Sequence, residues 1–181
     1  MQNIIKENPT AQALLDVVRD RYSCRSFKAE QVSKKQLDYI LECGRLAPTA
    51  KNLQEQHVYV CQSPESLAKI DEVTRSRYGA PTCLVITWDT ENTYIYPGER
   101  YNSGAEDATI VASHICLAAQ AIGLGSCWVN AFDPDKLHDL LGLPTKERIL
   151  MILSLGIPSE DAKPSPRHSD RKPIEETVTY M

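Results

Sequence analysis

The stretch from Asp107 to Ile122 constrains the fold of this chain more than any other segment. Almost every residue in it is small or apolar, with alanine at positions 108, 112, 118, 119 and 121. A helix that is apolar all round is buried, either in a core or at an interface. The Gly123-Leu124-Gly125 turn ends the pattern. The sequence therefore predicts one long buried helix in the second half of the chain.

The remaining sequence alternates helical patterns with short apolar runs. Helices are predicted at 10–22, 33–47, 63–73 and 134–141, and strands at 57–61, 83–87, 126–129 and 150–155. Thr10, Ser33 and Ser63 are candidate helix starts, and Pro48 ends the second helix. This order predicts layered helices and strands in a single domain, residues 1–181, and long helices beside short strands favour an α+β fold.

Charge and composition exclude several classes of protein. The net charge of −4 argues against binding to nucleic acid, which requires a basic face. No apolar run reaches the length of a membrane span, and residues 1–9 lack the pattern of an export signal, so we expect a cytoplasmic protein. The six cysteines have no metal-binding spacing and are expected to be reduced thiols.

The first candidate binding motif is Arg21-x-Ser23-x-Arg25. In an extended segment alternate side chains share a face, so two guanidinium groups and a hydroxyl point the same way. This grouping suits a phosphate, because arginine forms bidentate, charge-assisted hydrogen bonds with it. The alternative is a solvated basic turn after a helix. Cys24, between the two arginines, is a weaker candidate for a nucleophile.

Three further segments have the composition of binding loops. Ala47 to Gln54 ends a helix and offers amide side chains that can recognise the edge of a planar heterocycle. Gly123 to Ala131 combines glycines, which let a ligand approach the backbone, with Trp128 and Asn130. The tail can fold back onto an anion through Arg167, Arg171 and Lys172. The alternatives are an ordinary polar loop, a tight turn and a solvated tail. The sequence has no P-loop, nucleophile-elbow or zincin motif.

Together these segments, in this order, resemble the FMN-dependent nitroreductase family from about Asp16 to Val178. The resemblance rests on Arg21 to Phe27, Ala47 to Gln56, Asp107 to Phe132, Leu155 to Pro158 and Arg171 to Pro173. It implies a nitroreductase-like α+β fold, with a central, mostly antiparallel sheet flanked by helices. It also implies an intertwined homodimer with FMN at its interface and the 107–122 helix in its core.

The resemblance also implies a role for each motif. Arg21, Ser23 and Arg171 would hold the phosphate, with Tyr22 beside them, and Arg25 would reach the ribityl chain and the pyrimidine edge. The other subunit would contribute Pro48, Thr49, Ala50 and Asn52, and Gln54 is counted among the cofactor-binding residues. The isoalloxazine would be lined by Trp128, Val129, Asn130 and Ala131, and Cys127 would lie within that wall.

The implied reaction is a ping-pong transfer. NADH or NADPH passes a hydride to FMN, and a small-molecule acceptor such as a nitroaromatic or a quinone then takes the electrons. No side chain need act as an acid or base, and no metal is expected. The alternatives are a flavin store or sensor without nicotinamide-driven turnover, and a structural module that only dimerises. Glu55-Gln56 stands where many relatives have Pro-Trp, and Asn130-Ala131 where many have an acidic residue and a glycine. Arg75 or Arg77 is a possible further contact to the flavin.

Overall fold

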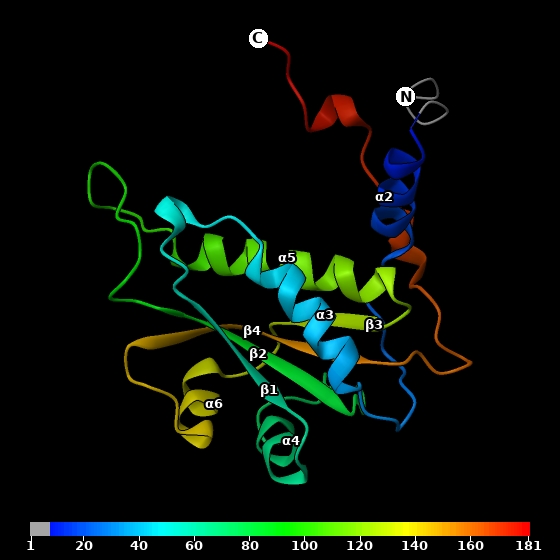
Figure 1. The fold of residues 1–181 in the computed structure, drawn as a ribbon, viewed down its shortest axis with the longest axis horizontal. Helices are drawn as coiled ribbons and strands as arrows, with labels where there is room; N and C mark the ends of the chain where they lie inside the picture. Colours follow the sequence, from blue (N-terminus) through cyan, green and yellow to red (C-terminus); the bar gives the residue numbers. More distant parts are fainter. Residues whose placement is uncertain (1–7) are drawn as a thin grey trace.

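The computed structural model describes residues 8–181, which form a four-stranded sheet with helices on both of its faces (Figure 1). The expectation about an export signal rests largely on residues 1–7, which lie outside the described part. Within residues 8–181, no helix combines the length and the hydropathy of a membrane span. The helices are α2 (Pro9–Asp20), α3 (Lys34–Arg45), α4 (Pro64–Asp71), α5 (Gly104–Ala121) and α6 (Pro134–Leu141), with 3₁₀ turns η1 (Ala50–Asn52), η2 (Pro166–His168) and η3 (Ile174–Glu176).

The sheet has the strand order β1-β2-β4-β3, and each neighbouring pair is antiparallel. Its strands are β1 (Gln56–Cys61), β2 (Thr82–Asp89), β3 (Gly125–Val129) and β4 (Glu147–Gly156). Each contains a strand predicted from the sequence. β4 begins three residues earlier than predicted, because a bulge that leaves Leu150 unpaired allows pairing with β2 to continue to Glu147.

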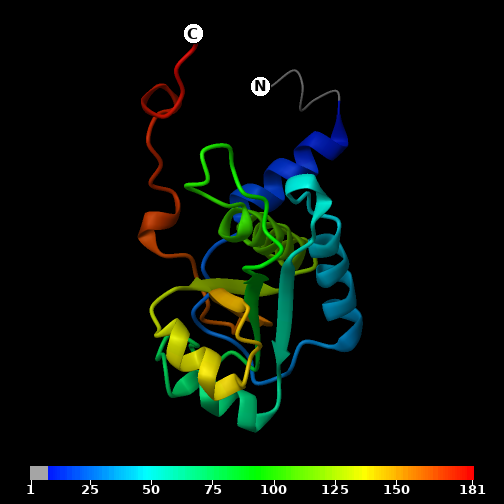
Figure 2. The ribbon, with the colours of Figure 1, turned by 90° about the vertical axis from the view of Figure 1, so that its left-hand side faces the viewer.

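The two faces of the sheet carry separate apolar clusters. Leu84 and Ile86 of β2 face α3 and α5, while Cys83 and Val85 alternate with them and face α4 and α6. Figure 2 shows the two helical layers on opposite sides of the sheet. Gly44 allows α3 to pack closely on α5, because a Cβ there would lie 2.8 Å from Cγ1 of Ile115. The predicted buried helix is thus α5, which spans the first of these faces.

The helix starts follow polar caps. Ser33 and Gln36 form a capping box at α3, and the side chains of Ser63 and Asp133 accept backbone hydrogen bonds at the starts of α4 and α6. The expectation for Thr10 is wrong. Asn8 caps α2 instead, because Pro9 occupies the first helical position and the Asn8 side chain accepts a hydrogen bond from the Thr10 amide.

Two apolar surfaces are left uncovered in the single chain. No residue of α2 is buried, and Leu14 and Val18 are 60% and 50% exposed. The chain after η2 leaves the body of the molecule, as Figure 2 shows, and Ile174 and Tyr180 are exposed. Both segments place large apolar side chains in solvent, which marks surfaces that suit a partner.

Candidate functional site

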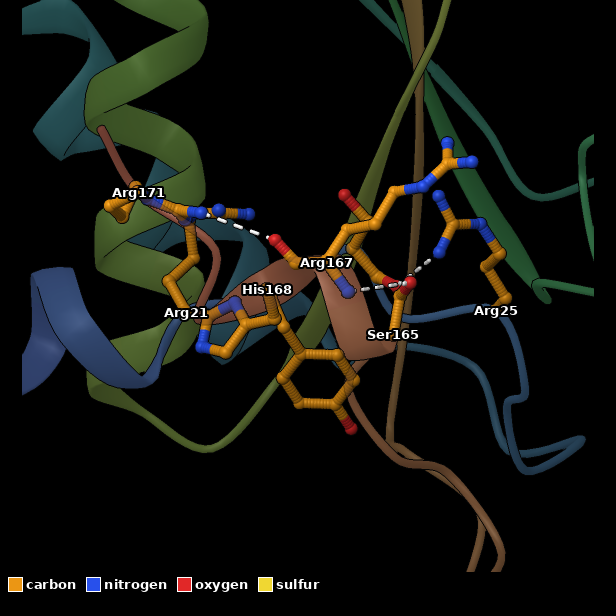
Figure 3. A pocket seen from close by; sticks show the side chains of 8 residues that line it. Arg21, Arg25, Ser165, Arg167, His168 and Arg171 are labelled. Atoms are coloured by element: carbon orange, nitrogen blue, oxygen red, sulfur yellow. Dashed lines mark hydrogen bonds between the residues drawn. The ribbon is translucent and has the colours of Figure 1, made fainter.

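The most strongly charged cavity lies where α2 ends and the tail passes over the sheet edge. It has a volume of about 430 Å³, and we call it the arginine pocket (Figure 3). It brings together six residues that the sequence analysis singled out and two others. Its lining residues are Arg21, Tyr22, Ser23, Arg25, Ser165, Arg167, His168 and Arg171.

The backbone between α2 and α3 positions the first arginines. α2 ends at Asp20, and Arg21 leaves the helix in an extended conformation. Ser23 then forms a parallel bridge with Ser126 at the edge of the sheet, and the Cys24 amide donates to the Ser126 carbonyl at 2.9 Å. Because side chains alternate along this segment, Cys24 is fully buried while Ser23 and Arg25 line the pocket.

The tail supplies the other side of the pocket. Ser165 accepts a hydrogen bond from the Arg167 amide and starts the η2 turn, which carries His168. The Arg171 guanidinium donates to the carbonyls of Arg167 and Asp170, at 3.3 and 2.9 Å. In the view of Figure 3, the Arg21 and Arg171 side chains lie on one side of the pocket and the side chains of Arg25 and Arg167 on the other. Two segments far apart in the sequence thus form one cationic surface.

The four pocket arginines have no carboxylate partner within residues 8–181. Arg45 and Arg77, by contrast, lie 2.7 and 2.5 Å from carboxylate oxygens of Glu42 and Asp71. Bringing four like charges together is unfavourable unless a counter-charge arrives. The donor set therefore suits an anion with several oxygen atoms, such as a phosphate.

A second cavity of about 390 Å³ shares Arg21 and Ser23 with the arginine pocket. It also reaches α5 and β3, and we call it the tryptophan cavity. The rest of its lining is largely apolar: Ser113, Cys116, Leu117, Ser126 and Trp128. The two cavities together suit a ligand that has an anionic group at one end and a planar, largely apolar body at the other.

The predicted β3 wall is divided between the two faces of the sheet. Trp128 lines the tryptophan cavity, and its Nε1 donates to the Asn130 side chain at 3.1 Å. The side chains of Cys127 and Val129 point the other way into the cluster beside α4 and α6, because side chains alternate along a strand. The placement of Cys127 in a ligand-facing wall is therefore wrong, and Val129 offers only its backbone. Ala131 follows the strand, and its carbonyl accepts from Thr74 at 2.8 Å.

The three cysteines near the arginines are buried. Burial raises the pKa of Cys116 and of Cys127, although Arg21 counteracts the effect at both and Arg25 does so at Cys127. Cys24 is fully buried, and its thiol donates a hydrogen bond to the Ser26 carbonyl at 3.2 Å. The pKa of Tyr22 is also raised, first by burial and then by Cys24. The geometry disfavours Cys24 as a nucleophile.

The loop predicted to bind from the other subunit lies at the opposite end of α5. The Ala50 amide donates to Asp107 in the first turn of that helix, at 3.0 Å. Along the helix axis, Cys116 in the tryptophan cavity lies about 14 Å beyond Asp107. Within one chain, therefore, Pro48 to Gln54 do not join the arginine pocket. Three residues of this loop have a positive φ: Lys51 (51°), Asn52 (57°) and Gln54 (55°).

Some basic residues behave differently from the sequence expectation. Arg167 and Arg171 lie in the pocket, as the hypothesis of a tail that folds back onto an anion requires, whereas the sequence gives no prediction for Ser165 and His168. The sole signal for them is their place in the proline-rich segment before Arg171. Lys172 lies 3.9 Å from Glu176 rather than in the pocket. Arg77 donates to both carboxylate oxygens of Asp71 and to the Ala80 carbonyl, and does not line the arginine pocket.

Comparison with known proteins adds sequence evidence. Residues 18–79 and 75–157 match the model of the Nitroreductase family. The chain is 31% identical over 180 residues to the FMN reductase [NAD(P)H] of Bacillus subtilis, which covers 90% of the chain and 72% of the relative. It is 26% identical over 192 residues to the NADH dehydrogenase of Thermus thermophilus, covering 88% and 92%.

Comparison of structures agrees with the sequence match. A nitroreductase family protein from Clostridium difficile 630 superposes with a TM-score of 0.85 at 31% identity, covering 91% of this chain and 96% of the other. The fold is also shared, at a TM-score of 0.80 and 19% identity, by a protein from Exiguobacterium sibiricum whose structure contains FMN. That alignment covers 93% of this chain and 97% of the other.

Proposed function

This chain belongs to the nitroreductase family, and from that premise we propose that it is an FMN-dependent NAD(P)H oxidoreductase that reduces small acceptors such as nitroaromatics or quinones. One observation carries the proposal. Four guanidinium groups without carboxylate partners in the described chain adjoin a largely apolar cavity that contains Trp128. FMN combines the two properties that this surface requires, a phosphate and a planar ring.

The residues present fit this cofactor. Arg21, Ser23 and Arg171 would hold the phosphate, with Tyr22 beside them, because their donors surround one end of the pocket. Arg25 and Arg167 would lie toward the ribityl chain and the pyrimidine edge. The ring would lie against Trp128, Asn130 and Ala131, and a backbone amide near Ala131 would donate to the ring nitrogen that accepts the hydride.

When bound, FMN supplies the redox chemistry, which is hydride acceptance from NADH or NADPH and electron transfer to the acceptor in a ping-pong sequence. The chain supplies orientation and charge. The guanidinium groups of Arg25 and Arg167 favour negative charge beside them and so adjust the reduction potential. Leu117 and Trp128 line the cavity and would limit the access of water to a bound ring.

We further propose that the active form is a homodimer. Leu14 and Val17 of α2 border an apolar groove that α3 and α5 complete through Cys43, Leu117, Ala118 and Ala121. A second copy would cover this groove and the exposed tail. It would also bring Pro48 to Gln54 of the partner subunit to the tryptophan cavity, which those residues do not reach within one chain. Light scattering on the purified protein is expected to give twice the chain mass.

The decisive test is spectroscopic. The purified protein should be yellow or bind added FMN, and NADH or NADPH should bleach the flavin absorbance without oxygen. A nitroaromatic or a quinone should then restore the colour. A colourless protein without affinity for FMN would refute the proposal. A yellow protein that neither nicotinamide bleaches would indicate a flavin store or sensor instead.

A further inference from the structure

Two buried carboxyl groups meet at the start of α5, away from the arginine pocket. Glu55 precedes β1, and Asp107 lies in the first turn of α5; they are 4% and 3% exposed. Each has one satisfied oxygen. Glu55 Oε1 accepts from the Ser103 hydroxyl at 3.1 Å, and Asp107 Oδ1 accepts from the Ala50 amide at 3.0 Å. The other two oxygens, Glu55 Oε2 and Asp107 Oδ2, are buried without a donor from the described chain.

Both residues contact Ser103, whose hydroxyl donates to Glu55 and whose carbonyl accepts from the Asp107 amide at 2.8 Å. One proton shared between the two carboxyl groups would satisfy both of the unpartnered oxygens. The proton is assigned to Glu55, and an Asp107 oxygen accepts it. The pKa of Glu55 is raised above its ordinary value, first by burial and then by its hydrogen bond with Asp107. Two facing carboxylates without that proton would repel each other in a poorly hydrated site.

The cations near the pair are committed elsewhere. Lys51 of η1 lies over the Tyr94 ring, 4.5 Å from its centre, and Lys146 is paired with Asp89 at 2.6 Å. Glu106, on α5, accepts a hydrogen bond from Tyr96. Among residues 8–181, no salt bridge reaches Glu55 or Asp107, so the proton is the neutralising charge that remains.

The pair joins three parts of the chain. Through Ala50 it holds residues 49–54, which we call the strained segment because of its three positive φ angles. Through Ser103 it holds the 90–103 loop, since Ser103 exchanges hydrogen bonds with the Tyr94 backbone. The Glu55 carbonyl accepts from the Asp89 amide at the end of β2. A strained conformation persists only where its surroundings fix it, and these bonds provide that fixation.

We propose that Glu55 keeps its proton and donates it to Asp107, and that this hydrogen bond fastens the strained segment to the start of α5. Glu55 is then a positioning residue. Loss of the proton at higher pH loosens residues 49–54. If these residues contact the flavin of the partner subunit, which rests on the proposed function, flavin affinity falls as pH rises.

The proton itself is tested without flavin. Protein labelled with ¹³C at glutamate carboxyl carbons is titrated by NMR, with Glu55→Gln as the probe and exposed Glu72→Gln as the matched control. One glutamate resonance should have its titration midpoint at a higher pH than the others. This resonance should be absent in Glu55→Gln and present in Glu72→Gln. Titration of all glutamates together would overturn the shared proton.

Stability provides a second readout. Because the folded pKa exceeds the ordinary value of 4.5, the folded state retains a proton that the unfolded chain has lost. The free energy of unfolding should therefore fall as pH rises from about 4.5 through the folded pKa. Glu55→Gln should remove this fall, since its amide donates to Asp107 at every pH. Parallel profiles for the two proteins would contradict the proposal.

Positioning is tested by the dissociation constant for FMN at pH 5.5 and 8.5. At each pH, the dissociation constant of the wild type is divided by that of Glu55→Gln. The effect of FMN phosphate ionisation on binding then cancels, because it is the same for both proteins. That ratio should rise severalfold between the two pH values, because loss of the Glu55 proton loosens the segment only in the wild type. Glu55→Ala should bind weakly at both pH values, with rescue by glutamine. A constant ratio would refute positioning.

Absence of FMN binding in every protein would refute the proposed function, and the NMR titration would still decide the shared proton.

Discussion

Two charged sites lie near opposite ends of α5. Near its C-terminal half, the arginine pocket gathers four guanidinium groups without carboxylate partners in the described chain. At the other end, Glu55 and Asp107 are buried and accept hydrogen bonds from their own chain. Arg25, Arg167 and Arg171 are exposed, and both carboxyl groups are almost fully buried. Charge that is accessible and unpaired is available to a ligand, while charge that is buried and internally bonded holds the scaffold. Substitutions in the arginine pocket should therefore lower FMN affinity without loss of stability, whereas substitutions of the two carboxyl groups should lower stability as well.

The largest effect is expected in the arginine pocket. Replacing both Arg21 and Arg171 with alanine should weaken FMN binding by about 3 kcal/mol or more, since each lost charge-assisted bond costs about 1.5–3 kcal/mol. Arg21→Ala alone should cost about 1.5–3 kcal/mol. Fluorescence titration with FMN measures both. The exposed Arg148→Ala is the control and should bind like the wild type. The phosphate assignment fails if the double variant retains its affinity.

Substitution of Glu55 or Asp107, which we call the acid pair, is expected to lower the stability of the fold. Asp107→Ala should lower the free energy of unfolding by about 1–3 kcal/mol, because the Ala50 amide loses its acceptor and buried Glu55 its partner. Urea unfolding without FMN measures this loss, and the double arginine variant should show none. Asp107→Asn keeps the acceptor and should cost much less. Equal losses for the alanine and asparagine variants would argue against a bonding role for Asp107.

A smaller effect is expected when an anion replaces the missing counter-charge. With 10 mM inorganic phosphate and a dissociation constant of about 1 mM, the wild type should gain about 1.4 kcal/mol of stability. Thermal unfolding at matched ionic strength in chloride separates binding from screening. The double arginine variant should gain almost nothing. An equal gain in both proteins would show that phosphate acts outside the pocket.

The smallest effect is expected within the strained segment itself. Thr49→Val removes the hydroxyl that accepts a hydrogen bond from the Gln54 amide at 3.1 Å. Gln54 is exposed and water can replace the bond, so the loss of stability should be about 0.5 kcal/mol. Urea unfolding beside Asp107→Ala gives the comparison. If the two variants lose equal stability, the segment is held by its own bonds rather than by the acid pair.

Local signals in the sequence carried most of the fold. The apolar run after Asp107, the Ser33 cap and the β-branched run at 83–87 each reflect interactions between near neighbours, and each predicted element is present. The cap of α2 was misplaced because Asn8 and Thr10 are equally plausible by type, and the choice depends on the Pro9 backbone. The bulge at Leu150 depends on pairing with β2 and leaves no local pattern.

The site could be predicted less completely from the sequence, because it depends on contacts between segments that are far apart in the chain. Alternation along an extended segment brought Arg21, Ser23 and Arg25 together correctly. Arg167 and His168 reach the pocket only because the tail crosses the sheet edge, which is a tertiary property. The same holds for Glu55, whose importance depends on burial against Asp107. Cys127 was misassigned because sequence proximity to Trp128 does not reveal which face of β3 each side chain occupies.

The bridge between Ser23 and Ser126 has a consequence for aggregation. β3 is an edge strand, and an uncovered strand edge can template pairing with other chains. The 21–27 segment lies against this edge through the Ser126 carbonyl and a further bridge from Phe27 to Pro158. The backbone that carries the arginine motif therefore also shields the sheet.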